Sequence, residues 1–151
     1  MFNYCPLIWM FCCKQAHNLI DKAHYRALKA RYLDFESSFT SLLCKSKSTS
    51  VHIKNLKLMI CMVFQSLHGT GPEILHGLFS QSQNPYFLRS GFTLALPREK
   101  RQNPNCFYFR AVLAWNRLPN HIKEAKTFNS FKSRLYEIAP YCNCKYCVSF
   151  Y

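Results

Sequence analysis

Residues 50–69, SVHIKNLKLMICMVFQSLHG, hold the pattern that decides the fold of this chain. Their apolar side chains recur at steps of three and four residues, which predicts an α-helix. These side chains are Ile53, Leu56, Ile60, Val63 and Leu67. We expect the helix to begin after a cap at Thr49 or Ser50 and to end at Gly69. Because residues 56–64 are apolar on nearly every side, this helix is predicted to lie at the centre of the core.

Residues 14–32 also have helical spacing, and their two faces differ in character. One narrow face carries small and apolar side chains, which would let the helix pack closely against a neighbour. These are Ala16, Ile20, Ala23, Ala27 and Ala30. The opposite face holds Lys14, Asn18, Lys22, Tyr25 and Lys29, with Arg26 at its edge. Cations around a tyrosine suit phosphate contact and base stacking, and the simpler alternative is a solvated charged face.

Shorter helices are expected in three other places. They are residues 39–44, residues 72–79 and a last helix from a cap at Thr127 to Pro140. Residues 80–106 contain three prolines and a glycine, which favours an irregular or partly extended segment. The stretch 107–119, FYFRAVLAWNRLP, fits a strand turning into a short helix, and periodicity does not decide between helix and strand. The predicted fold class is mainly α, a small helical bundle with an irregular or partly extended segment around residues 80–112.

The chain is strongly basic, with 20 Lys and Arg against 7 Asp and Glu, a formal net charge of +13. Such a surface attracts nucleic acid or anionic lipid over long range, so a polyanion partner is expected. Besides the helix at 14–32, a second basic group is predicted in PREKRQ, at Arg98, Lys100 and Arg101. We therefore predict that the nucleic-acid-binding residues are Lys14, Lys22, Tyr25, Arg26, Lys29, Arg98, Lys100 and Arg101.

No catalytic residues are predicted. The sequence lacks the G-x-x-x-x-G-K, G-x-S-x-G and H-E-x-x-H signatures. Two-metal phosphoryl transfer needs carboxylates that converge on the ions, and the seven acidic residues are scattered with no adjacent aspartate pair. Six histidines leave a Cys/His nucleophile open, but no pair of residues is marked by spacing.

Nine cysteines, an odd number, argue against a secreted disulfide framework and favour a reducing intracellular location, nuclear or cytoplasmic. The tail YCNCKYC is the one local constellation. One hypothesis places zinc at Cys142, Cys144 and Cys147. Because tetrahedral sites need four ligands, the fourth would come from Cys106 or His121, or the site would be incomplete. The alternative is a cluster of reduced thiols without a metal.

The opening stretch, MFNYCPLIWMFCC, resembles a targeting segment only at first sight. Asn3 and Pro6 interrupt the apolar run, and Cys12-Cys13-Lys14 offers no small-residue cleavage site. The run also falls short of the roughly 20 apolar residues of a spanning helix. We expect a buried segment that packs against structure encoded upstream, and no membrane partner.

Several blocks, taken in order, resemble the region beyond the catalytic core in reverse transcriptases of non-LTR retrotransposons, the LINE group that includes jockey-type elements. The blocks are FNYCPLIWMF, NLIDKAHYRALK, VHIKNLKLMICMVFQSLHGTGPEIL, NPYFLRS, AWNRLPNHIKEAKTFNSFKSRLYE and the cysteine-bearing tail. Together they cover essentially the whole chain. Two departures are Tyr25, where the family often has a glutamate, and the lack of a glycine before the W-N-x-L-P block.

The resemblance implies a non-catalytic C-terminal fragment of an RNA-directed DNA polymerase, whose palm and fingers precede residue 1. It implies three regions: a thumb-like helical region at 1–79, an irregular basic connector at 80–112, and a C-terminal helix with a cysteine-bearing tail at 113–151. RNA or DNA would be held through the phosphate backbone. The alternative is a small basic helical interaction protein that binds a protein partner.

Overall fold

The computed structural model describes residues 10, 14–81, 93–96 and 106–138, and this part of the chain is mainly helical, which confirms the predicted fold class. Its helices are α2 (Lys14–Tyr32), α3 (Phe39–Lys45), α4 (Val51–Leu67), the 3₁₀ turn η1 (Glu73–Leu75), α5 (Phe107–Asn116), α6 (Asn120–Lys123) and α7 (Phe128–Tyr136). The only pairing of extended backbone in the described ranges is an isolated antiparallel bridge between Gln81 and Leu94.

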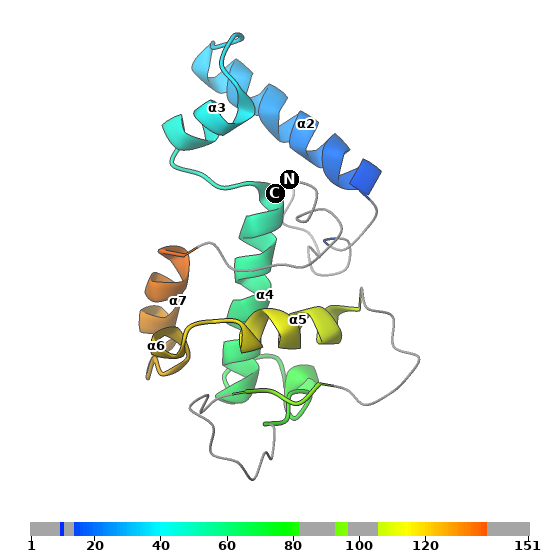
Figure 1. The fold of residues 1–151 in the computed structure, drawn as a ribbon, viewed down its shortest axis with the longest axis vertical. Coiled ribbons are helices and arrows are strands. Elements are labelled where there is room, and N and C mark those ends of the chain that lie inside the picture. The colour runs from blue at the N-terminus through cyan, green and yellow to red at the C-terminus, as the bar shows by residue number, and fades with distance from the viewer. Residues whose placement is uncertain (1–9, 11–13, 82–92, 97–105, 139–151) are drawn as a thin grey trace.

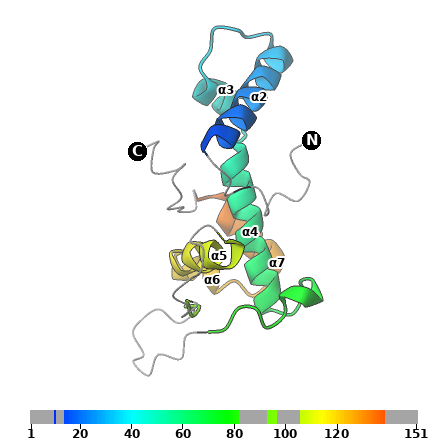
Figure 2. The ribbon, with the colours of Figure 1, turned by 90° about the vertical axis from the view of Figure 1, so that its right-hand side faces the viewer.

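Helix α4 runs along the length of the molecule and joins two groups of helices (Figure 1). At one end α2 and α3 form a hairpin, which we call the α2–α3 hairpin. At the other end α5 and α7 pack against α4, with α6 beside α7 (Figure 1, Figure 2). The hairpin is therefore attached through the first turns of α4, away from the larger group.

The predicted boundaries of α4 are confirmed, and Ser50 rather than Thr49 is its N-cap. The Ser50 side chain accepts a hydrogen bond from the Ile53 amide at 3.4 Å, which satisfies one of the unpaired N–H groups of the first turn. At the other end Gly69 has a φ of 65°, the left-handed conformation that commonly closes a helix. The central position predicted for this helix is confirmed as well, since most of its side chains are buried.

Aromatic rings tie α4 to α5 and α7. Phe64 stacks on Phe131 with ring centroids 4.2 Å apart, and Trp115 stacks on the same phenylalanine at 5.8 Å. All three rings are at most 2% exposed. Stacked rings add about 0.5–1.5 kcal/mol per pair to the free energy of burial. Phe131 therefore joins α7 to both α4 and α5.

Residues 107–116 form a helix throughout, so the strand considered for this stretch is absent. The predicted irregular segment at 80–112 consequently ends earlier than expected, and its proposed boundary with the C-terminal region falls inside α5. The reason is packing, because Ala111, Val112 and Trp115 lie at helical spacing against α4. Residues 82–92 and 97–105 of the predicted connector lie outside the described ranges.

Asn116 fastens the short extended piece 93–96 to the helices. Its Oδ1 accepts a hydrogen bond from the Leu94 amide at 2.8 Å, and its Nδ2 donates to the Leu94 carbonyl at 2.9 Å. The side-chain amide thus pairs with the backbone as a neighbouring strand would. Leu94 is only 3% exposed, so its backbone groups need these partners.

Two buried lysines donate hydrogen bonds to carbonyls at the ends of helices. Lys57 donates from Nζ to the carbonyl of Tyr136 at 3.0 Å, and Lys123 donates to the carbonyl of Asn116 at 3.1 Å. Both acceptors belong to the last residue of a helix, where unpaired carbonyls carry partial negative charge. Burial lowers the pKa of both ammonium groups from their usual value. These cations therefore serve the core and are not available to a polyanion.

We predict that Asn116→Ala lowers the free energy of unfolding by about 2–4 kcal/mol, because it leaves the buried N–H and C=O of Leu94 unpaired. Urea denaturation followed by circular dichroism measures this change. Asn129→Ala, an identical change at an exposed position of α7, is the matched control and should alter stability by less than about 0.5 kcal/mol. Equal losses in the two variants would contradict the role given to Asn116.

Candidate nucleic-acid interface

The first predicted basic group lies along α2. Lys14 is the first residue of the helix, and the side chains of Lys22 and Arg26 are exposed. Lys29 is half-buried and places its Nζ 4.3 Å from the centre of the Tyr25 ring, a cation–π contact. Residues three and four apart share one side of a helix, so Lys22, Arg26 and Lys29 form one surface about 10 Å long. We call this surface the α2 basic face.

The second predicted basic group is Arg98, Lys100 and Arg101, and it lies outside the described residues. Its approach to the α2 basic face therefore stays a prediction.

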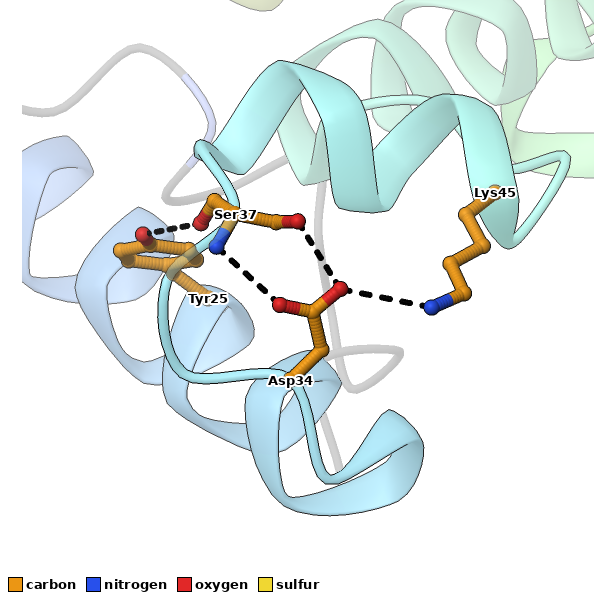
Figure 3. A network of polar contacts seen from close by, with 4 residues as sticks. All are labelled: Tyr25, Asp34, Ser37 and Lys45. Atoms are coloured by element: carbon orange, nitrogen blue, oxygen red, sulfur yellow. Dashed lines mark hydrogen bonds and ion pairs between the residues drawn. The ribbon is translucent and has the colours of Figure 1, made fainter.

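Tyr25 has a structural role that the sequence did not suggest. Its hydroxyl donates a hydrogen bond of 2.7 Å to the Ser37 carbonyl (Figure 3). Its ring meets Phe39 of α3 with centroids 5.6 Å apart. With Lys29 over the ring, Tyr25 joins α2 to the start of α3. Base stacking on this ring stays a prediction, and the ring already has partners within the hairpin.

A single carboxylate holds the connection between the two helices. Asp34 accepts hydrogen bonds from the Ser37 hydroxyl at 2.8 Å, the Ser37 amide at 3.1 Å and the Lys45 ammonium at 3.3 Å (Figure 3). All three donors favour the ionised form, and the Ser37 hydroxyl contributes most to lowering the pKa of Asp34 below its ordinary value. The loop between α2 and α3 is thus tied to both helices.

The packed face of α2 is not the alanine face predicted from the sequence. Ala23, Ala27 and Ala30 are exposed, whereas His17 and Leu28 are buried. The prediction was wrong because α3 and the start of α4 offer aromatic partners to the other side of the helix. Small side chains have little apolar area to bury by comparison.

Imidazoles fill the junction between α2 and α4. The ring of His17 meets that of His52 edge-on, with centroids 5.0 Å apart, and both are nearly fully buried. Burial raises the pKa of the half-buried Asp21 carboxyl nearby, while His52 acts in the opposite direction. Burial and, secondarily, Lys54 lower the pKa of His24. These groups belong to the packed face, so they are separate from the α2 basic face.

The predicted zinc ligands Cys142, Cys144 and Cys147 lie outside the described residues. Of the two proposed sources of a fourth ligand, Cys106 precedes α5 and is half-buried, and His121 of α6 is exposed. Among the described residues no group of three or more His, Cys, Asp or Glu side chains is arranged to hold a metal ion. Zinc at the tail stays a prediction.

The sequence analysis did not predict that the connection between α2 and α3 exposes large apolar side chains. Leu33 is 80% exposed and Phe35 is 65% exposed, and both lie just after the end of α2 at Tyr32. An available signal was the presence of two large apolar residues in a short polar connection, where turn-forming residues are usual.

Comparison of the chain with protein-family models, with curated proteins and with solved structures finds no match. The resemblance to reverse transcriptases therefore rests on the sequence blocks alone. In the portion of the chain with assigned structure, no helix has both the length and the apolar character needed to cross a bilayer.

The Asp34 contacts predict a pH-dependent loop. Because the Ser37 and Lys45 contacts lower the pKa of Asp34 from its ordinary value, the carboxylate stabilises the loop above about pH 4, and this stabilisation is lost as pH falls through the folded pKa. Hydrogen exchange of the Ser37 amide, measured by NMR from about pH 6 to pH 2 with correction for its intrinsic pH dependence, should show protection disappearing at the acid end.

Asp34→Asn should remove most of this pH dependence, whereas Glu36→Gln, which removes the neighbouring exposed carboxylate, should leave it in place. A Ser37 profile in Asp34→Asn that matches the parent would show that another group controls the loop.

Proposed function

We propose that the chain is a non-catalytic, nucleic-acid-binding region of a non-LTR retrotransposon reverse transcriptase, and that it holds RNA or DNA by the phosphate backbone. One observation carries the binding part of the proposal. Lys22, Arg26 and Lys29 share one side of α2, where Lys22 and Arg26 are exposed and Lys29 is half-buried over the Tyr25 ring. The assignment to reverse transcriptases rests on the order of the resembling sequence blocks.

The surroundings of the α2 basic face favour a polyanion. Asp34 is engaged by Ser37 and Lys45, and Asp21 lies in the junction with α4, so neither carboxylate belongs to this surface. The exposed side chains of Ala23 and Ala27 lie beside the cations and are too short to keep a phosphate backbone away. A positive surface of this kind releases counterions from nucleic acid on binding, which makes affinity depend on salt.

The proposal gives this chain no step in polymerisation. Asp21 and Asp34 are the only aspartates in the sequence, and they lie at different positions along α2 and its following loop, each with a local structural partner. Two-metal chemistry needs carboxylates close enough to share ions about 4 Å apart. In the proposed polymerase that chemistry belongs to the palm.

We predict that charge reversal of the α2 basic face weakens binding to all sequences alike. The variant Lys22→Glu, Arg26→Glu, Lys29→Glu should flatten the log–log salt dependence of the association constant by about 2–3, because roughly three phosphate contacts are lost. Fluorescence anisotropy titrations of labelled oligonucleotides at several salt concentrations measure the slope. Little change between oligonucleotide sequences is expected, because phosphate contacts carry no base information.

The matched control reverses three exposed cations at the other end of the molecule, Arg117, Lys126 and Lys132, and changes the net charge equally. Both variants must keep the parent's helical circular dichroism. If the control loses as much affinity and slope as the α2 variant, binding depends on total charge and the assigned surface is wrong.

A second candidate function is binding of a protein partner, and the exposed alanine face of α2 favours it. Leu19, 67% exposed, lies on the same side as Ala23 and Ala27, which makes a shallow apolar stripe suited to a helix. The titrations above distinguish the two candidates. A folded chain that binds neither RNA nor DNA at low salt would remove the first candidate and leave the second.

A further inference from the structure

Residues 33–36, which we call the hairpin tip, contain a leucine in a conformation that suits glycine. The Asp34 amide donates to the Lys29 carbonyl at 3.2 Å, and this closure of α2 puts Leu33 in the left-handed region with a φ of 50°. Helix α4 ends in a similar way, but there Gly69 occupies the left-handed position. Leucine at such a position is strained. Lys47, with the same φ of 50°, closes α3 in a similar way.

Because the tip is exposed, the folding free energy gives no reason for a leucine at position 33. The Leu33 side chain is 80% exposed and Phe35, two residues later, is 65% exposed. Neither residue belongs to the hydrophobic core cluster. Leu33 therefore strains the backbone without burying apolar area in return, and Phe35 presents most of an aromatic ring to solvent.

The tip is held in place rather than loosely tethered. The contacts of Asp34 with Ser37 and Lys45, and of Tyr25 with Ser37, fix the chain on both sides of Phe35 (Figure 3). The tip lies at the end of the molecule remote from α5, α6 and α7 (Figure 1, Figure 2). An apolar group fixed in this way loses little conformational freedom when a ligand binds.

Cations predominate in the α2–α3 hairpin as a whole, whereas the tip itself carries two carboxylates, Asp34 and Glu36. The hairpin from residue 14 to residue 47 carries seven Lys and Arg against three Asp and Glu. The α2 basic face ends at Lys29, and Leu33 begins about one helical turn, roughly 6 Å, beyond it. A polyanion lying along α2 would therefore bring its next unit to an apolar, aromatic surface.

We propose that the hairpin tip contacts unstacked bases of single-stranded nucleic acid, with Phe35 stacking on a base and Leu33 packing beside it. The inference rests on the proposed function and adds to it a preference for single strands. Bases in a single strand offer their faces to aromatic side chains, whereas a duplex hides them in its stack. The phosphates contact the α2 basic face and the bases contact the tip.

A lipid surface is the competing ligand, because apolar tips beside cations also bind anionic membranes. Asp34 is engaged by Ser37 and Lys45. The exposed Glu36, however, follows Phe35 directly, so insertion of the apolar side chains would press the Glu36 carboxylate against anionic head groups. A base face carries no such charge. The charge pattern therefore favours the single strand.

The test compares affinities of the full chain for oligouridylate and oligothymidylate of about 20 nucleotides and for a mixed-sequence duplex of equal length. Phe35→Ala should weaken single-strand binding about five- to fiftyfold and duplex binding less than twofold, with the salt slope unchanged. Leu33→Gly should raise the Tm, because it relieves the left-handed leucine, and yet weaken single-strand binding. Ile74→Ala, at an 87% exposed position outside the hairpin, should change neither.

Each contrary outcome has a separate meaning. If the parent binds with a steep salt dependence and Phe35→Ala binds single strands equally well, the tip contact is wrong while the proposed function stands. If the parent binds no nucleic acid, both fail. If Phe35→Ala leaves nucleic-acid binding unchanged but abolishes sedimentation with phosphatidylserine-containing vesicles, the tip is a lipid contact and the inference is overturned.

Discussion

Stacking of Phe64 on Phe131 is the contact on which the rest of the structure depends, because it locks α7 onto α4 from residues 67 positions apart. Trp115 completes the stack and brings α5 to the same place. Once the rings are buried, the last carbonyls of α5 and α7 need hydrogen-bond partners. Lys123 donates to the α5 carbonyl of Asn116, and Lys57 donates to the α7 carbonyl of Tyr136. Asn116 then fastens the extended piece at Leu94. Burial of the aromatic rings therefore determines which polar groups need hydrogen-bond partners. The hydrogen bonds that these groups form then position the rest of the described chain.

The sequence predicted well those elements whose signals are local. The sequence alone shows the helical spacing of α4, its Ser50 cap and the Thr127 cap of α7. Capping and helical spacing involve residues within one or two turns of each other, so they are visible in the sequence. The packed face of α2 could not. Both sides of that helix carry plausible contact residues, and the choice was made by partners elsewhere in the chain, Phe39 and His52. The roles of Lys57 and Asn116 were equally hidden, since each depends on a backbone group far away in sequence.

The candidate site also has features that local sequence signals predict and features that depend on distant partners. Helical spacing was enough to gather Lys22, Arg26 and Lys29, whereas the engagement of Tyr25 by Ser37 depends on how the loop folds back. The hairpin tip needed the structure as well, because only the closure of α2 shows that Leu33 is left-handed and exposed. At this end of α4 a left-handed leucine and an exposed phenylalanine lie about one helical turn beyond the α2 basic face. This adjacency supports the proposal that the hairpin is the binding end of the molecule.

We propose that single-stranded nucleic acid binds along α2 and over the hairpin tip. Backbone hydrogen exchange of the full chain, measured by mass spectrometry with and without a saturating single-stranded oligonucleotide, maps the contact directly. Binding along α2 and over the hairpin tip predicts added protection in peptides covering residues 22–37, with α5 and α7 unchanged. Protection confined to peptides from α5–α7, or no protection despite measured binding, would contradict it.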